Sequence, residues 1–501
     1  MTSANDEILP KNSEQEAGPI RESILIAAAS VLLVLPCFWH EFLVCVDLGS
    51  HTYAAWIATL ISRGDAPGLY IATQKSNVLF DWILSASCTY FGYGPGEKIA
   101  AAIAVLIFFW GAFAFFTVLA TKRRWDLALP LAMFSYGWTF QTGLFNYYLS
   151  VGLALAALAA LWTRETRGRI VCLALLPLVM LAHPLGFVVF VAFAVFEEIA
   201  HRFAWRGVLI AFIASVISMV VTRSYLASHY LVSYSGRPLW TTTGADQLVL
   251  YGPLYVGLAF ASLFLFVTVA IKVIDPRWSR PEEQRTKQIL VGTLYILVLL
   301  AIVILPDEVV WNVTTSKASL LVNRATLVAA ILLFALTAVS PSSRWRTASW
   351  GVISVVFFIS LYISMGTLSK LQRSAYDTVR GLPPGVRLSA SGNWQPLLGV
   401  NNPHLAERAC VERCFIVSNY ELVSNQFRVR VKFQNPLVSK DLRAIDSMQE
   451  GLYVVKPEDL PLFAIHPCEQ RGKVCVGQLK AGDRNGNPSI ELGTAVAPSN
   501  P

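Results

Sequence analysis

The chain has 501 residues, of which only 14% are charged, and its 40 Lys and Arg against 32 Asp and Glu give a formal net charge of +8. Soluble domains carry about 25% charged residues, whereas hydrophobic residues make up 55% of this chain. This composition excludes a disordered chain, an ordinary cytosolic protein and a protein that coats nucleic acid.

The charged residues are concentrated at the two ends of the chain. Residues 1–22 contain 7 of them and residues 368–501 contain 28, which leaves 37 for residues 23–367. We therefore predict a cytoplasmic N-terminal tail over 1–22, a transmembrane domain over 23–367 and an extracytoplasmic C-terminal domain over 368–501.

Hydrophobic stretches in the middle region have the length of membrane-spanning helices, which need about 20 apolar residues each. Two stretches are long enough for a pair of short helices that meet near the outer face. The first, 127–162, has a polar interruption around 141–146, and the second, 170–200, is broken by His183-Pro184 because proline disfavours helix at and before its position. Seven further stretches fit one span each: about 23–43, 99–121, 207–225, 248–271, 289–306, 320–340 and 348–367. The predicted fold is a polytopic α-helical membrane protein with about eleven transmembrane helices.

The connecting segments differ in charge from one side of the membrane to the other. With the N-terminus inside, 17 basic residues fall in cytoplasmic segments and few in outer loops, among them Arg63, Lys75, Arg237 and Lys317. This bias predicts the N-terminus inside and the C-terminal domain outside. The net charge therefore reflects membrane insertion, and we expect no nucleic-acid partner. The first hydrophobic run lacks a small-residue cleavage pattern before Asp47, so we expect a membrane anchor there instead of a signal peptide.

The first outer loop, 44–98, contains the most informative charged pair. Asp47 and His51 are four residues apart, so a helix that begins here places them on one face, and Arg63-Gly64 predicts where that helix ends. A carboxylate held beside an imidazole can accept a proton from a hydroxyl nucleophile. The alternative is that Asp47 serves only as the N-cap of this helix.

Other polar residues of the membrane region lie near the predicted outer face. His183, at the tip of a helix pair, either lines a cavity or has hydrogen-bond partners within its own turn. The loop 226–247, which includes Asp246, has aromatic and polar residues that suit sugar stacking and equally an interfacial aromatic belt. Asp307-Glu308 could supply a second carboxylate or a ligand for a divalent cation, the only cofactor that we consider, or could be a solvated loop end.

Two arginines lie in or beside predicted spans. Arg324 is about seven residues into the tenth span, where a charge is costly without an anionic partner, and an internal pair or snorkelling is the alternative. Arg223 lies at the outer end of the seventh span, where snorkelling to the interface is easier.

The C-terminal domain reads as small and mostly β or α+β. Turn-forming segments separate short runs that favour strands, among them Cys414–Ser418, Gln426–Phe433 and Gly451–Val455. Its four cysteines are an even number in an oxidising compartment and predict disulfides, as two local loops or as crossed pairs. A zinc site is the competing possibility, but the spacing lacks a C-x-x-C pair and no histidine is close. The four cysteines are Cys410, Cys414, Cys468 and Cys475.

An acidic residue just after the first span, followed by a short interfacial helix, resembles the GT-C class of integral-membrane glycosyltransferases. Asp47 and His51 match the D-x-x-x-H form of that loop. Lys75 lies where relatives commonly have a lysine, although the segment 74–77 lacks the paired prolines of the aminoarabinose and mannosyl transferases. Three tail segments also resemble bacterial membrane proteins of this architecture: Arg413-Cys414-Phe415, Asn419-Tyr420-Glu421 and Phe427-Arg428-Val429-Arg430.

The resemblance implies a multi-pass enzyme of the bacterial inner membrane that moves a sugar from a polyprenyl-phosphate donor to an extracytoplasmic acceptor. It implies Asp47 as general base, His51 as a residue that orients Asp47 or the substrate, and Arg324 as the ligand of the lipid phosphate, with Arg223 as the alternative. Lys75, His183 and Asp246 are the further candidate substrate-binding residues.

Two functions from other classes stay open at this stage. A transporter or flippase predicts functional charges near the bilayer midplane and inverted repeats, and neither is visible in the sequence. A non-catalytic envelope assembly protein is the other. The sequence contains no phosphate-binding glycine loop, dinucleotide fingerprint, H-E-x-x-H or G-x-S-x-G motif, which argues against a nucleotide-driven pump.

Overall fold

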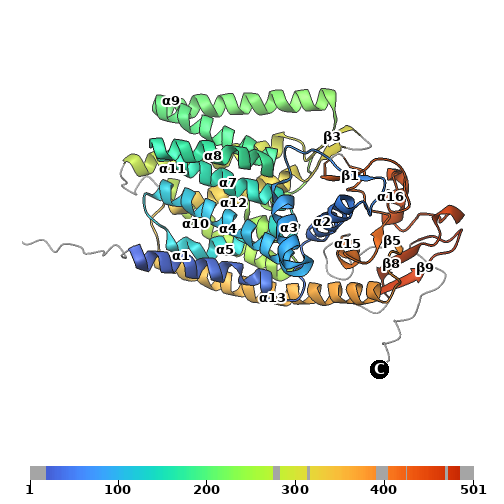
Figure 1. Cartoon of the computed structure of the whole chain (residues 1–501). Coiled ribbons are helices and arrows are strands. Elements are labelled where there is room, and N and C mark those ends of the chain that lie inside the picture. The colour runs from blue at the N-terminus through green and yellow to red at the C-terminus, as the bar shows by residue number, and fades with distance from the viewer. Residues whose placement is uncertain are drawn as a thin grey trace, which may run out of the picture.

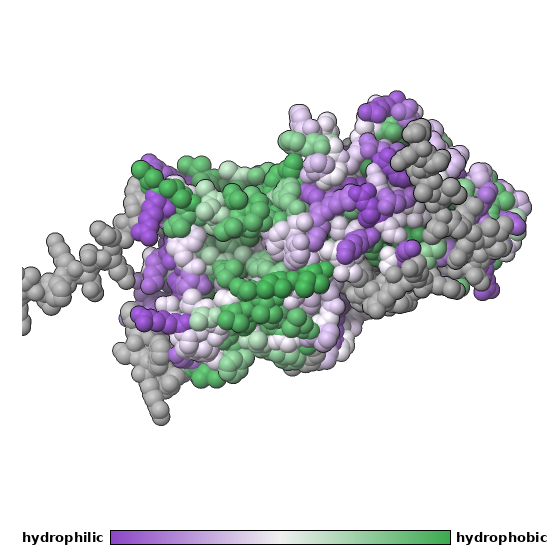
Figure 2. Space-filling view, turned by 90° about the horizontal axis from the view of Figure 1, so that it is seen from below, coloured by the Kyte–Doolittle hydropathy of each residue, from purple (hydrophilic) through white to green (hydrophobic). Residues whose placement is uncertain are grey.

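The computed structural model describes residues 19–274, 282–312, 316–390, 404–424, 426–468 and 472–485. A bundle of long helices fills one part of the molecule, and the C-terminal strands gather beside one end of the bundle (Figure 1). A band of hydrophobic residues covers the helical part, while hydrophilic residues collect at its two ends (Figure 2). The chain is a multi-span membrane protein, as predicted.

Within the described ranges, nine helical segments are long and apolar enough to cross a membrane. They come from eight helices: α1 (Pro19–Val34, continued by a 3-10 turn, Leu35–Phe38), α4 (Tyr93–Ala120), α7 (Phe145–Trp162), α9 (Pro184–His229), α10 (Pro253–Ile274), α11 (Glu282–Ile304), α12 (Leu321–Ala338) and α13 (Arg344–Arg380). The predicted count of eleven is not confirmed. The remaining two predicted spans correspond to shorter helices: α5 (Ala128–Ser135) with α6 (Trp138–Gln141), and α8 (Thr166–Ala182).

Helix α9 provides two of the nine segments because it reverses direction. A Cβ built on Gly207 would lie 2.2 Å from the carbonyl oxygen of Ile199. In a straight helix, residues eight apart are separated by about 12 Å along the axis. The two arms therefore fold back on each other near Gly207, where a side chain would collide with the opposite arm. At its start, Pro184 follows the α8 C-cap His183, as the His183-Pro184 break predicts.

The first outer loop folds into α2 (Leu48–Arg63), β1 (Leu69–Ile71) and α3 (Leu79–Phe91). Helix α2 ends at Gly64, which has a φ of +83° and donates its N–H to the last turn, so the predicted end of this helix is confirmed.

The C-terminal region has an α+β arrangement. Its four-stranded sheet has the order β6-β5-β8-β9, in which β5 runs parallel to β6 and to β8, and β8 runs antiparallel to β9. Disulfides join Cys410 to Cys414 and Cys468 to Cys475, which are the two local pairs. The elements are β5 (Arg387–Ala390), α15 (Leu405–Cys410), β6 (Phe415–Ile416), β7 (Val429–Val431), α16 (Leu442–Gln449), β8 (Phe463–Pro467) and β9 (Val474–Gln478).

The first loop and the C-terminal region are built together. Strand β1 of the loop pairs antiparallel with β7, which lies in the predicted strand Gln426–Phe433. Tyr53, Trp56 and Ile57 of α2 share one hydrophobic cluster with Leu388, Leu405 and Ile416. Helix α13 continues without a break through the predicted boundary at 367/368 and reaches the C-terminal strands (Figure 1). The division into three domains stays a prediction.

Predicted outer loops meet at the same end of the bundle. Strands β2 (Leu231–Ser233), β3 (Glu308–Asn312) and β4 (Ser316–Ala318) form one antiparallel sheet from two of these loops, and the Gln426 side chain donates to the Lys317 carbonyl. At the other end, Arg123 pairs with Glu22, and Gln284 donates to the Val339 carbonyl. Which end faces the cytoplasm stays a prediction from the charge bias.

Candidate active site

Asp47 lies at the N-cap position of α2, but its side chain makes no capping hydrogen bond. The carboxylate is 29% exposed, so it is available to a ligand. The backbone around it is fixed by the turn between α6 and α7, where Asp47 N–H donates to the Thr142 carbonyl at 3.1 Å. Gly143 in that turn has a φ of +80°, and a Cβ there would lie 2.7 Å from the Asp47 nitrogen. The capping alternative therefore does not account for the Asp47 carboxylate.

His51 lies one turn further along α2, is buried, and pairs with an aspartate that the sequence did not single out. Its Nδ1 is 2.8 Å from Asp81 Oδ1 on α3. Asn146, in the first turn of α7, donates to the other Asp81 oxygen at 2.9 Å. The contact of His51 is thus with Asp81, whereas we had expected it to orient Asp47 or the substrate.

The C-terminal region brings a second imidazole and two more carboxylates to α2. His404 Nε2 lies 3.7 Å from Asp47 Oδ1, and its Nδ1 lies 3.5 Å from Glu407 Oε1. Ser50, on the first turn of α2, donates its hydroxyl to Glu421. His404, Glu407 and Glu421 are each 1–2% exposed. Asp47 therefore stands at the edge of a buried cluster of acids and imidazoles.

The carboxylates around the two imidazoles favour their charged form. Burial lowers the pKa of His51, but the hydrogen-bonded Asp81 carboxylate, together with Glu421 and Asp47, raises it to about 9. Burial likewise lowers the pKa of His404, and the carboxylates of Glu407, Glu421 and Asp47 raise it to about 9. Burial raises the pKa of Glu421 to about 7, with the two imidazoles opposing this rise. The cluster is thus a set of mutually compensating charges next to a partly exposed carboxylate.

Arg324 lies beside this cluster, in the first turn of α12. Its guanidinium donates to the Ser319 carbonyl at 2.8 Å, its buried Nε has no hydrogen-bond partner within the described chain, and it lies in electrostatic reach of Asp47. Tyr147 connects it to the α8–α9 turn: its hydroxyl donates to the Arg324 carbonyl at 2.6 Å, and its ring lies 5.6 Å from the His183 ring. His183 also caps α9 by accepting the Leu185 N–H.

The other three candidates have no contact with the Asp47 cluster in the described chain. Arg223 donates to the Ile304 carbonyl at 3.0 Å and lies over the Tyr234 ring. Lys75 is exposed in the loop after β1. Asp246 accepts the Gly244 N–H, and burial raises its pKa to about 6. Arg324 is thus the candidate within electrostatic reach of Asp47, and His183 is connected to Arg324 through Tyr147.

Sequence reasoning missed Asp81, Asn146, His404, Glu407 and Glu421. Glu421 lies in the segment Asn419-Tyr420-Glu421, which resembles bacterial membrane proteins of this architecture, but no feature of the sequence placed it in the site. The others come from α3, α7 and α15, and one sequence contains no pattern that brings these helices to α2.

No group of three or more His, Cys, Asp or Glu side chains in the described residues is arranged to hold a metal ion. Asp307, named above as a possible ligand of a divalent cation, accepts the Val322 N–H at the start of α12, and Glu308 pairs with Lys317. These contacts give the two carboxylates structural partners.

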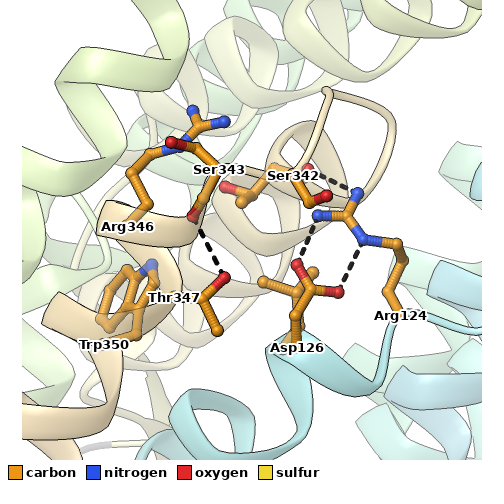
Figure 3. A pocket seen from close by; sticks show the side chains of 9 residues that line it. Arg124, Asp126, Ser342, Ser343, Arg346, Thr347 and Trp350 are labelled. Atoms are coloured by element: carbon orange, nitrogen blue, oxygen red, sulfur yellow. Dashed lines mark hydrogen bonds and ion pairs between the residues drawn. The ribbon is translucent and has the colours of Figure 1, made fainter.

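At the opposite end of the bundle, a polar recess lies between the α12–α13 turn and the segment before α5 (Figure 3). Arg124 pairs with Asp126 at 2.8 Å and donates to the carbonyls of Thr337 and Ala338 at the end of α12 and to the Ser340 carbonyl just after it. The Thr347 hydroxyl donates to the Ser343 carbonyl. These bonds satisfy Arg124 and Asp126, while Arg346, which also lines the recess, has one buried nitrogen without a hydrogen-bond partner in the described chain.

No protein-family model and no curated protein sequence matches the chain. Among solved structures it is similar to apo ArnT from Cupriavidus metallidurans, with a TM-score of 0.50 and 12% identity over 90% of this chain and 93% of that chain. The same protein bound to undecaprenyl phosphate gives 0.46 and 13% over 89% and 93%. Archaeal oligosaccharyltransferase AglB from Archaeoglobus fulgidus gives 0.36 and 10% over 89% and 69%. The likeness to apo ArnT shows that the chain shares the fold of that protein.

Proposed function

We propose that this protein is a membrane glycosyltransferase that transfers a sugar from a polyprenyl-phosphate donor to an acceptor on the extracytoplasmic side. Asp47 is the general base in this proposal, and Arg324 binds the donor phosphate. The shared fold with apo ArnT supports the reaction class, and the D-x-x-x-H loop of Asp47 and His51 supports the position of the base.

The single observation that carries the proposal is the position and exposure of the Asp47 carboxylate. Its carboxylate stands at a helix N-terminus without capping it, is partly exposed, and has an imidazole of His404 at 3.7 Å. A general base needs an accessible carboxylate within reach of the proton that it removes. In the proposed reaction, the acceptor oxygen or nitrogen bonds to the anomeric carbon of the sugar while Asp47 accepts the proton from that acceptor atom. The bond between the sugar carbon and the phosphate oxygen breaks, and the lipid phosphate leaves.

Arg324 supports the second half of the reaction. The leaving lipid phosphate is an anion, and a guanidinium can donate two parallel hydrogen bonds to it. Arg324 has a buried Nε without a hydrogen-bond partner in the described chain and shares the electrostatic neighbourhood of Asp47. The Tyr147 hydroxyl donates to the Arg324 backbone carbonyl, and the Tyr147 ring lies between the guanidinium, at 5.9 Å, and the His183 ring, at 5.6 Å.

The experiment compares purified wild-type protein with D47N in the release of undecaprenyl phosphate from undecaprenyl-phosphate-linked sugars, with envelope extract as the source of acceptor. A general base contributes about 100-fold to 10,000-fold in rate, so we expect D47N to lose at least about 100-fold. The matched control is D65N, an exposed aspartate of the same loop just after α2.

An unchanged rate in D47N contradicts the assignment of the base. If the wild-type protein releases undecaprenyl phosphate from none of the tested sugars, the transferase proposal is wrong and an envelope assembly role takes its place.

A further inference from the structure

Asp81, in the first turn of α3, has a hydrogen-bond partner for each of its two carboxylate oxygens. Oδ1 lies 2.8 Å from His51 Nδ1 of α2, and Oδ2 accepts the Asn146 amide of α7 at 2.9 Å. Asn146 is itself fixed, because its oxygen accepts the Phe80 N–H at 2.8 Å, which leaves its NH2 group to donate to Asp81. The carboxylate is thus held in one orientation by partners from two other helices.

This carboxylate decides which ring nitrogen of His51 is a donor toward α3. An ionised carboxylate can only accept hydrogen bonds, so the 2.8 Å contact makes Nδ1 an N–H donor. Burial raises the pKa of Asp81, but His51, Asn146 and Arg428 outweigh burial and lower it, which agrees with an ionised carboxylate. The His51 ring is also packed edge-on against Phe80, with ring centroids 5.7 Å apart. The orientation of the imidazole is therefore set before any ligand binds.

The other ring nitrogen of His51 points away from Asp81. Nε2 has no hydrogen-bond partner in the described chain, and 9% of the side chain stays exposed. Burial lowers the pKa of His51, but the carboxylates of Asp81, Glu421 and Asp47 raise it to about 9. They favour the charged form, in which Nε2 carries an N–H as well. Arg324 also lies in electrostatic reach of Asp47, so two cations adjoin the partly exposed carboxylate.

His51 and Arg324 each have a donor nitrogen without a partner in the described chain. These nitrogens are Nε2 of His51 and the buried Nε of Arg324. A buried donor without a partner is costly, and a charged donor bonds best to an anionic oxygen. A phosphate presents several such oxygens, so the two donors can share one phosphate. Both nitrogens therefore suit the same anionic ligand.

We propose that Asp81 is a positioning residue that acts through His51: it holds the imidazole by Nδ1, so that the Nε2 N–H donates to the phosphate of the lipid-linked sugar together with Arg324. The identity of this phosphate rests on the proposed function, whereas the geometry of the Asp81–His51 pair stands without it. Asp81 touches no substrate itself, and its effect on phosphate binding passes through the imidazole.

The first measurement is nitrogen nuclear magnetic resonance of protein with isotope-labelled histidine in detergent at neutral pH, which needs no substrate. The chain has 7 histidines, so the His51 signals are identified by their absence in H51Q. We expect both His51 ring nitrogens to be protonated in the wild type. In D81N we expect Nδ1 to be unprotonated, because the new amide can donate to it while the amide oxygen accepts from Asn146. A protonated Nδ1 in D81N overturns the proposal.

The second measurement is the binding of undecaprenyl phosphate to purified protein in detergent, compared with undecaprenol, which lacks the phosphate. Charged hydrogen bonds are stronger than neutral ones, so we expect a loss of about 5-fold to 10-fold in D81N and about 10-fold or more in H51Q. Undecaprenol binding should not change. The double variant H51Q/D81N should bind as H51Q does, because Asp81 acts through His51. The matched control is D65N, an exposed aspartate just after α2, which should behave as wild type in both measurements.

The outcomes separate the role of the pair from the transferase function. A further loss from D81N in the H51Q background, equal to its loss in the wild type, means that Asp81 is only structural and overturns the proposal. Wild-type preference for undecaprenyl phosphate that neither D81N nor H51Q weakens overturns the role of the pair and leaves the transferase proposal standing. If the wild-type protein does not distinguish undecaprenyl phosphate from undecaprenol, the transferase proposal fails and the phosphate role of His51 is overturned with it.

Discussion

The two ends of the helical bundle differ in the partners that their buried charged groups have. At the Arg124 end, the Arg124 guanidinium is matched by the two oxygens of Asp126 and by three backbone carbonyls, those of Thr337, Ala338 and Ser340. The neighbouring Arg346 donates to the Pro341 carbonyl and keeps one buried nitrogen without a hydrogen-bond partner in the described chain. At the Asp47 end, one oxygen each of Glu407 and Glu421 has no hydrogen-bond partner in the described chain. A matched charge closes a helix end, whereas buried carboxylates with incomplete partners are costly and mark candidates for function.

The comparison also separates two uses of charge within the Asp47 end itself. Arg408 and Glu97 form a close, buried pair that fastens the tail to α4, whereas the His404 contacts with Asp47 and Glu407 are looser, at 3.7 and 3.5 Å. The Arg408–Glu97 pair attaches the tail to α4, whereas the longer His404 contacts are not direct hydrogen bonds.

The largest expected effect is the loss of the Arg408–Glu97 pair. R408M leaves the Glu97 carboxylate, 1% exposed, without its partner. Breaking a buried pair costs about 3–5 kcal/mol, whereas replacing both partners is often nearly neutral. Thermal unfolding in detergent should therefore show a large loss in R408M and a partial recovery in E97Q/R408M.

The control for this prediction is R373M, which removes an arginine that is 42% exposed and paired with the exposed Glu41. A surface pair contributes about 0–1 kcal/mol. Equal losses in R408M and R373M contradict the view that the tail is attached through the buried pair.

The next effect lies at the opposite end. R124Q removes the donors that satisfy the last carbonyls of α12 and leaves Asp126 without its partner. Hydrogen bonds to charged groups contribute about 1.5–3 kcal/mol, so we expect a destabilisation of about 3 kcal/mol in unfolding experiments. Folded R124Q should release undecaprenyl phosphate at the wild-type rate, because Arg124 has no contact with the Asp47 cluster in the described chain. A large loss of rate in folded R124Q would contradict the distinction between the two ends.

The sequence predicted the features that depend on local or periodic signals. The end of α2 at Gly64, the break at His183-Pro184 and the multi-span helical fold follow from glycine conformation, proline chemistry and hydropathy. The prediction of a β or α+β tail followed from its turns and its short runs of β-forming residues, although no strand covers Gly451–Val455.

The contacts between distant parts could not be predicted in this way. The pairing of β1 with β7 joins residues that are about 360 positions apart, and hydropathy treated the first loop and the tail as separate regions. His404 reaches the site through such a long-range contact, whereas Asp81 lies only 30 residues after His51, in the same loop. The residue types of both gave no reason to prefer them over other polar residues. The position of Asp47 was local information, but the charges that surround it were not.

The smallest expected effect is a difference in pH sensitivity between the two ends, measured by hydrogen exchange corrected for the intrinsic rate. The raised pKa of His404 and His51, from 6.5 to about 9, means that their stabilisation is complete below pH 6.5 and is lost as pH rises through 9. Burial raises the pKa of Glu421 from 4.5 to about 7, so the folded protein binds the Glu421 proton more tightly than the unfolded chain. The stability linked to Glu421 therefore falls as the pH rises from 4.5 to about 7. Protection of α2 and α15 should therefore decrease between pH 6.5 and 9.

The Arg124 end should respond in the opposite direction. Burial raises the pKa of Asp126, but the hydrogen bonds and charge of Arg124 hold it below its usual 3.8. This contribution is present above pH 3.8 and is lost as pH falls through the lowered pKa. Protection at the α12 end should stay constant from pH 6.5 to 9 and decrease only in strong acid. If both ends lose protection together on the alkaline side, global unfolding is the cause, and the local role of the histidines is contradicted. If α2 and α15 alone respond and H404Q removes part of that response, the titrating group is the imidazole that joins the tail to Asp47.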